Sequence, residues 1–175
     1  MRKSFPILLL VLLASSPAFG FQNDWIKFEP PAENFSILMP IQPKENVSKA
    51  DTAGVGPSSA TSYLAREGTQ LYLLGFVDYA TFVFNNQKEL EANRDNFMKP
   101  VNATLDESRN LTWKTFPSIE FKAHSPEYSF IGRILIVGKR PYMLVVAYPI
   151  NEAVPANTEK FFSSFNVRPR GSKGL

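Results

Sequence analysis

The chain has 175 residues, with 19 Lys and Arg against 16 Asp and Glu, a single His and no Cys. The absence of cysteine excludes a disulfide framework, a thiolate metal site and a cysteine nucleophile, so stability has to come from a hydrophobic core. Without the two basic residues of the N-terminal segment, 17 basic residues stand against 16 acidic ones. A charge so close to balance gives no electrostatic support for nucleic-acid binding.

The first twenty residues have the pattern of a signal peptide. A cationic head at residues 2–3 precedes an apolar run over residues 5–14, which is well short of the ~20 residues that span a bilayer as a helix. The small residues Ala18 and Gly20 suit signal peptidase, so the sequence predicts cleavage between Gly20 and Phe21. The product would be exported to the periplasm or the medium with no transmembrane segment. An uncleaved N-terminal anchor is the alternative.

The rest of the chain is predicted to form one domain over residues 21–167, followed by a flexible basic tail over 168–175. Its N-terminal half begins with apolar runs that end at proline and are typical of short strands. A polar stretch from Lys44 to Ala60, without apolar periodicity, is predicted to be a long loop. The strands expected around this loop are Trp25–Phe28, Phe35–Met39, Thr61–Arg66 and Leu71–Tyr79.

A helix is predicted from about Gln87 to Lys99. Asn86 and Glu89 have the spacing of a capping box, and apolar residues follow at helical spacing until Pro100. A second helix is predicted near the C-terminus, where Pro155 suits a first turn and an apolar stripe follows at Phe161, Phe162 and Phe165.

Two further strands and a hairpin fill the region between these helices. The segment Leu105–Lys114 alternates weakly and is predicted to be a sheet edge, whereas Ser118–Ser125 alternates regularly. The apolar runs Ile134–Val137 and Tyr142–Tyr148, separated by Gly138, predict a buried antiparallel hairpin. The predicted fold is therefore α+β, a mostly antiparallel β-sheet flanked by helices.

The spacing of several apolar and proline positions resembles that of a Mog1/PsbP-like domain. The residues concerned are Trp25-x-x-Phe28-x-Pro30-Pro31, Phe35-Ser36-Ile37-Leu38-Met39-Pro40-x-x-Pro43, Ile119-Glu120-Phe121, Tyr142 and Phe161-x-x-Ser164-Phe165. The resemblance implies an α/β sandwich around an antiparallel sheet. Known members of this fold class are chiefly binding or assembly modules, among them an extrinsic photosystem subunit and a partner of a small GTPase. No partner-contact motif of either maps onto residues of this chain.

The residue types leave little room for familiar catalytic chemistry. A Ser–His–Asp arrangement would need His124, and no Gly-x-Ser-x-Gly elbow is present. Glu120, His124 and Glu127 are the weak candidates for a metal site, but Glu120 and His124 also fit a solvated strand face. We expect no metal, no cofactor and no enzymatic activity, although a carboxylate-only active site stays open because such pairs are spatial.

The candidate partner-binding residues are charged and lie in two segments. Lys44, Lys49 and Asp51 belong to the predicted loop, and Arg133, Lys139 and Arg140 belong to the apolar hairpin. Either the hairpin residues form a contact surface for an anionic partner, or Arg133 has a carboxylate or carbonyl partner beside the core and the tip lies in solvent. The expected function is that of an exported, non-catalytic binding or assembly module of the cell envelope. A carrier of a small apolar ligand in a sheet–helix cavity is the alternative, and a hydrolase comes last.

Overall fold

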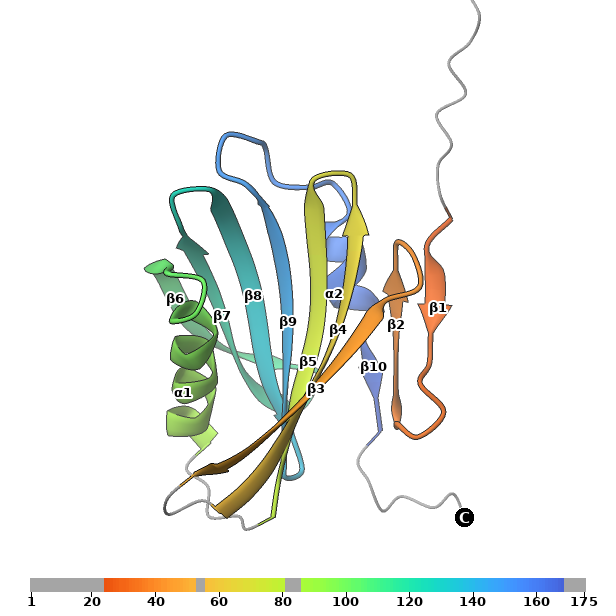
Figure 1. The fold of residues 1–175 in the computed structure, drawn as a ribbon, viewed down its shortest axis with the longest axis vertical. Coiled ribbons are helices and arrows are strands. Elements are labelled where there is room, and N and C mark those ends of the chain that lie inside the picture. The colour runs from red at the N-terminus through yellow and green to blue at the C-terminus, as the bar shows by residue number, and fades with distance from the viewer. Residues whose placement is uncertain (1–23, 53–55, 81–85, 169–175) are drawn as a thin grey trace, which may run out of the picture.

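Seven antiparallel strands form the larger of two sheets in the computed structural model, which describes residues 24–52, 56–80 and 86–168. Their spatial order is β3-β4-β5-β9-β8-β7-β6, so β3 and β6 are the two edges (Figure 1). The strands are β3 (Lys44–Thr52), β4 (Gly56–Glu67), β5 (Gln70–Tyr79), β6 (Thr104–Trp113), β7 (Phe116–His124), β8 (Tyr128–Val137) and β9 (Arg140–Pro149).

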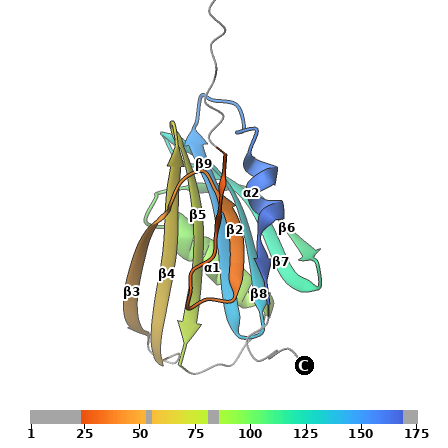
Figure 2. The ribbon, with the colours of Figure 1, turned by 90° about the vertical axis from the view of Figure 1, so that its right-hand side faces the viewer.

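A smaller sheet and two helices cover the faces of this large sheet. The small sheet contains β1 (Ile26–Phe28), β2 (Phe35–Met39) and β10 (Asn166–Val167), in the order β1-β2-β10. It lies on one face together with α2 (Thr158–Ser164), as Figure 2 shows. The other face carries α1 (Asn86–Met98).

The central strands β5, β8 and β9 each contribute to two separate cores because successive side chains point to opposite faces. In β5, Tyr72, Leu74 and Phe76 are buried against the small sheet and α2, whereas Leu71 and Leu73 pack toward α1. The first core is mostly aromatic and contains Phe35, Tyr63, Tyr142, Phe161, Phe162 and Phe165. The second core contains Leu90, Ile119, Phe121, Phe130 and Val145.

Tight turns fix the register of two hairpins in the large sheet. Glu67 pairs with Gln70, and Val137 pairs with Arg140, so two residues form each turn. Gly68 and Gly138 occupy the first turn positions with φ values of 59° and 62°, a conformation that is costly for residues with a Cβ.

Most of the predicted elements are confirmed. The first helix begins at Asn86, the weakly alternating segment is the edge strand β6, and the apolar segment after Tyr128 is the hairpin β8–β9. Ile119, Phe121 and Ala123 of β7 are buried as predicted. The fold is nevertheless dominated by its sheets rather than being a balanced sandwich of helices and strands.

The prediction of a loop over Lys44–Ala60 is wrong. Its described residues form β3 and the beginning of β4, which pair in continuous antiparallel register from Lys44–Leu64 to Thr52–Gly56. Because β3 is an edge strand, its side chains from Lys44 to Lys49 are exposed, and no apolar alternation marks it in the sequence. The short strand β10 also escaped prediction, because it exists only through its pairing with β2.

The predicted signal peptide and its cleavage site between Gly20 and Phe21 lie outside the described residues, as do residues 169–175 of the predicted tail. Arg168 remains attached to the small sheet, since its backbone N–H donates to the carbonyl oxygen of Asn34 at 3.0 Å. Among the helices that the structure describes, none is long and apolar enough to cross a membrane.

Candidate functional site

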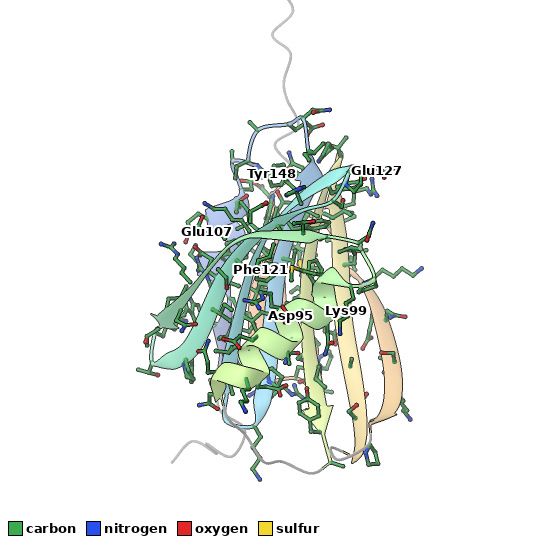
Figure 3. The ribbon with its side chains drawn as sticks, turned by 90° about the vertical axis from the view of Figure 1, so that its left-hand side faces the viewer. Asp95, Lys99, Glu107, Phe121, Glu127 and Tyr148 are labelled. Carbon is green, nitrogen blue, oxygen red and sulfur yellow. The ribbon has the colours of Figure 1, made fainter. Side chains whose placement is uncertain are left out.

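A hollow lies between α1 and the strands β4 and β5. Helix α1 packs on β7, β8 and β9, and Figure 3 shows it crossing one side of the sheet while β3, β4 and β5 continue beyond it. The hollow has a volume of about 430 Å³ and adjoins a smaller one of about 120 Å³ that reaches β3. The residues that line the larger hollow are Ser58, Ala60, Val77, Tyr79, Glu89, Ala92, Asn93, Asn96, Phe97 and Met143.

The smaller hollow lies over small residues of β4 and β5. Gly75 lies in the middle of β5, opposite Ser62 of β4 and Met143 of β9. A Cβ at position 75 would have ordinary contacts, with the backbone oxygen of Thr61 at 3.6 Å as its nearest neighbour. Neither the backbone conformation nor the packing therefore requires glycine here. Its effect is to leave space over the sheet, where glycine in a strand interior often admits the close approach of another group.

A hydrogen-bonded cluster joins α1 to the end of β5 at the rim of the hollow. The Tyr79 hydroxyl donates to Glu89 Oε1 at 2.6 Å, and Asn93 Nδ2 donates to the same oxygen at 2.7 Å and to the Glu89 carbonyl oxygen at 2.9 Å. Burial, followed by the hydrogen bond to Glu89, raises the pKa of Tyr79 above its ordinary value, so its hydroxyl keeps its proton. The hollow thus combines an apolar floor with a polar rim.

The helix that forms one wall is held in place by aromatic contacts. The ring of Phe97 lies 5.9 Å from that of Phe121 and 5.6 Å from that of Phe130, centroid to centroid. These edge and tilted geometries are the favoured ones for aromatic pairs. The wall is therefore anchored to the second core rather than free to close over the floor.

The candidate residues of the predicted loop lie on β3, beside the hollow rather than in it. Lys44 and Lys49 are exposed on this edge strand. Asp51 lies near the end of β3, where its backbone pairs with Pro57 of β4, and its side chain is outside the described part. The two β3 residues that line the smaller hollow are Asn46 and Ser48. Sequence reasoning missed them because the strand itself was not predicted.

Arg140 is buried, which corrects the expectation that the whole hairpin tip lies in solvent. Its guanidinium donates to both carboxylate oxygens of Asp78, at 2.7 and 2.5 Å, and to Glu33 in the turn between β1 and β2. It also stacks over the Phe76 ring, 4.0 Å from the centroid. Burial lowers the pKa of Arg140, but the bonds to Asp78 and Glu33 outweigh it and the net pKa is raised. Lys139, in contrast, is exposed.

Arg133 has the carboxylate partner that one of the two interpretations expected. Its Nη2 donates to Glu120 Oε2 at 2.7 Å, and the other Glu120 oxygen accepts from Arg109 Nη2 at 2.5 Å. The Arg133 guanidinium also lies 4.8 Å from the centroid of Phe162 in the first core. Arg133 therefore stabilises the sheet beside α2, and the structure does not bring it together with Lys139.

The three weak metal candidates are not assembled into a site. Glu120 is held between two arginines, and His124 Nδ1 lies 2.7 Å from Asp106 Oδ1 on the neighbouring strand β6. Glu127 lies in the exposed turn between β7 and β8. Within residues 24–52, 56–80 and 86–168, no group of three His, Asp or Glu side chains is placed to hold a metal ion.

The large antiparallel sheet carries the small sheet and α2 on one face and α1 on the other. This architecture is a PsbP-like fold. Searches against family models and against curated proteins find no match. Among solved structures, the chain is similar to the solution structure of cyanobacterial PsbP (CyanoP) from Synechocystis sp. PCC 6803, with a TM-score of 0.59 and 13% identity over 89% of this chain and 99% of that chain. The likeness confirms the predicted resemblance at the level of the fold.

Proposed function

We propose that the protein is an exported, non-catalytic binding module of the cell envelope, and that the hollow between α1 and β4–β5 is its binding site. The observation that carries the proposal is the space over Gly75, which lines the smaller hollow that adjoins this one and where a Cβ would make only ordinary contacts. Core positions of a strand are normally filled, since packing to high density stabilises a fold. Space left open over a central strand would be filled by a group that belongs to a bound partner or ligand.

The chemistry of the hollow defines the occupant as an apolar group flanked by hydrogen-bonding groups. Val77, Met143 and Phe97 offer apolar surface, and Asn93 and Asn96 offer amides at the rim. The volume of about 430 Å³ lies within the range of ~300–1,000 Å³ typical of ligand sites. The N-terminal signal pattern supports export, and the PsbP-like fold is compatible with a binding role.

A carrier of a small apolar ligand is the second candidate, favoured by the apolar floor. Carriers bury most of the ligand surface, typically 70–90% or more. Here Ala92 and Asn96 are exposed along the rim and the hollow faces solvent. This geometry favours a side chain that projects from a larger envelope partner over a ligand that is fully enclosed.

The test replaces Gly75 with leucine, which fills the floor while keeping the strand. A photo-crosslinking amino acid at Ser62 or Asn96 should capture a partner in living cells, and Gly75→Leu should reduce that capture at least tenfold. The matched control is Thr112→Leu, which adds the same side chain at an exposed position of β6. Circular dichroism and urea unfolding report whether both variants keep the fold.

Two outcomes separate the candidates. Crosslinks that persist unchanged in Gly75→Leu would place the partner site elsewhere and contradict the proposal. If no protein is captured but mass spectrometry of organic extracts finds a small molecule bound to the wild type and absent from Gly75→Leu, the carrier function is the correct one.

A further inference from the structure

Strand β3 presents a long, regular and unpaired edge. Its nine residues pair with β4 on one side only, and no bulge interrupts that register. Figure 2 shows β3 at the outer margin of the large sheet, with the small sheet lying over the strands further in. Proteins usually block such edges with charged side chains, proline, bulges or a covering segment, because an open edge pairs readily with another strand. Strand β3 carries charged side chains but neither a proline nor a bulge. None of the described residues of this chain covers it.

The side chains on one face of β3 are self-complementary. Glu45, Val47 and Lys49 alternate along the strand and so share the face that carries the small sheet. The Tyr63 hydroxyl of β4 donates to Glu45 Oε1 at 3.3 Å, which confirms the face for this residue. Val47 lies at the centre of this strand and is 52% exposed.

We propose that β3 pairs with β3 of a second copy of this chain, antiparallel and about a two-fold axis through Val47. In this register Val47 faces Val47 of the other copy, and Glu45 of each copy faces Lys49 of the other. The central pair is apolar, and both flanking pairs join opposite charges, which are favourable in directly opposed cross-strand positions. The two large sheets become one continuous sheet through a symmetric interface.

Neighbouring registers are less favourable. A two-fold axis perpendicular to the sheet keeps residues of one parity on one face, so the axis has to pass through a residue. An axis through Ser48 places Glu45 opposite Asp51, and opposed like charges are destabilising. An axis through Asn46 leaves Lys49 opposite Pro43, which has no backbone N–H to donate. Of these three registers, the one centred on Val47 satisfies both charge and backbone pairing.

The test measures self-association of the mature protein by sedimentation equilibrium up to about 100 µM, because a strand-sized interface belongs to the weak class. The wild type should dimerise, and Glu45→Lys and Lys49→Glu alone should each weaken the dimer at least tenfold. Lys44→Glu is the matched control. It changes the net charge as Lys49→Glu does, but Lys44 has the other parity and faces Ala50 of the second copy, so the dimer should persist.

Mixing the two single variants gives the decisive result. One variant carries two lysines on this face and the other two glutamates, so an equimolar mixture should form heterodimers although neither variant dimerises alone. Misfolding cannot produce this recovery. The chain is free of cysteine, so Val47→Cys should also give a disulfide-linked dimer under mild oxidation, whereas Ser48→Cys should not. A monomeric wild type, a mixture that stays monomeric, or preferential crosslinking through Ser48→Cys would overturn the proposal.

Discussion

Gly75 and Gly132 occupy central strands of the same sheet, but their surroundings differ. A Cβ at Gly132 would lie 2.2 Å from two ring atoms of Phe121, so the buried Phe121 ring can pack directly on the backbone only because residue 132 is glycine. Phe121 is 1% exposed and is held from the other side by Phe97, which leaves its ring little freedom to move. The two glycines therefore serve different purposes, close packing at Gly132 and an open floor at Gly75.

We expect Gly132→Ala to destabilise the protein by ~1–3 kcal/mol, the usual effect of overpacking a core. Gly75→Ala should be neutral or should stabilise by up to ~1 kcal/mol, because the methyl group fits and the unfolded chain loses freedom. Urea unfolding of both variants measures the difference directly. Equal changes in the free energy of unfolding would show that the ring of Phe121 can move away from the added methyl group at low cost.

At the scale of elements, Arg140 joins three segments that are distant in sequence. It binds Asp78 at the end of β5 and Glu33 in the turn between β1 and β2, while it is itself the first residue of β9. The neighbouring Tyr142 hydroxyl donates to Asn34 Oδ1 at 3.2 Å and strengthens the same junction. Arg140 thus attaches the small sheet to the large one.

Replacing Arg140 with methionine keeps much of the side-chain volume but removes the guanidinium that Asp78 and Glu33 share. We expect a loss of ~3–5 kcal/mol, the usual effect of removing one partner from a buried ion pair. The control is Arg109→Met, whose side chain is 65% exposed and whose loss should destabilise the protein far less, because exposed ion pairs contribute little. Hydrogen exchange should quicken at Glu33 and Asn34 in Arg140→Met alone. Unchanged exchange there would mean that the small sheet is attached by its apolar contacts.

The elements that can be predicted are those whose buried face leaves a periodic pattern of apolar residues in the sequence. Strand β7 and the hairpin β8–β9 were found because their buried faces repeat every second residue, and α1 because of its capping pattern and helical spacing. The pattern fails for β3, whose described side chains face solvent whether or not the strand is paired. The environment of Arg140 was also not predictable, since its carboxylate partners come from residues 33 and 78.

The candidate site depended even less on local sequence. The hollow exists because α1 packs on β7–β9 and stops short of β4 and β5, a relation between elements that no local pattern records. Gly75 in a central apolar strand was the one available signal, and by itself it could equally have indicated a bulge. Catalytic and metal candidates were chosen by residue type, which explains why Glu120 and His124 turned out to be engaged with neighbouring strands instead.

At the scale of the whole molecule, the formal net charge is +3, and several charges are paired across one end of the large sheet. Arg109 on β6, Glu120 on β7 and Arg133 on β8 form a ladder over three adjacent strands. Lys122 and Glu107 form a second pair beside it, with Nζ and Oε2 2.8 Å apart. The stability that these ion pairs give to this side of the sheet therefore depends on pH, because it is lost when the carboxylates are protonated.

The pH dependence has a definite sign. Burial raises the pKa of the Glu120 carboxyl, but hydrogen bonds from Arg133 and Arg109 outweigh it, and the net pKa is below the ordinary value of 4.5. A carboxyl whose pKa is lower in the folded than in the unfolded state binds fewer protons when folded, so folding gains stability from it above pH ~4.5. That contribution is lost as the pH falls through the lowered pKa of the Glu120 carboxyl in the folded protein.

We expect the free energy of unfolding of the wild type to be level near neutral pH and to fall below pH ~4.5. Glu120→Gln should be less stable than the wild type at pH 7, and its free energy of unfolding should fall less steeply below pH ~4.5. Urea unfolding of both proteins between pH 3 and 7 measures this, and parallel curves below pH ~4.5 would show that other carboxyls govern the acid limb.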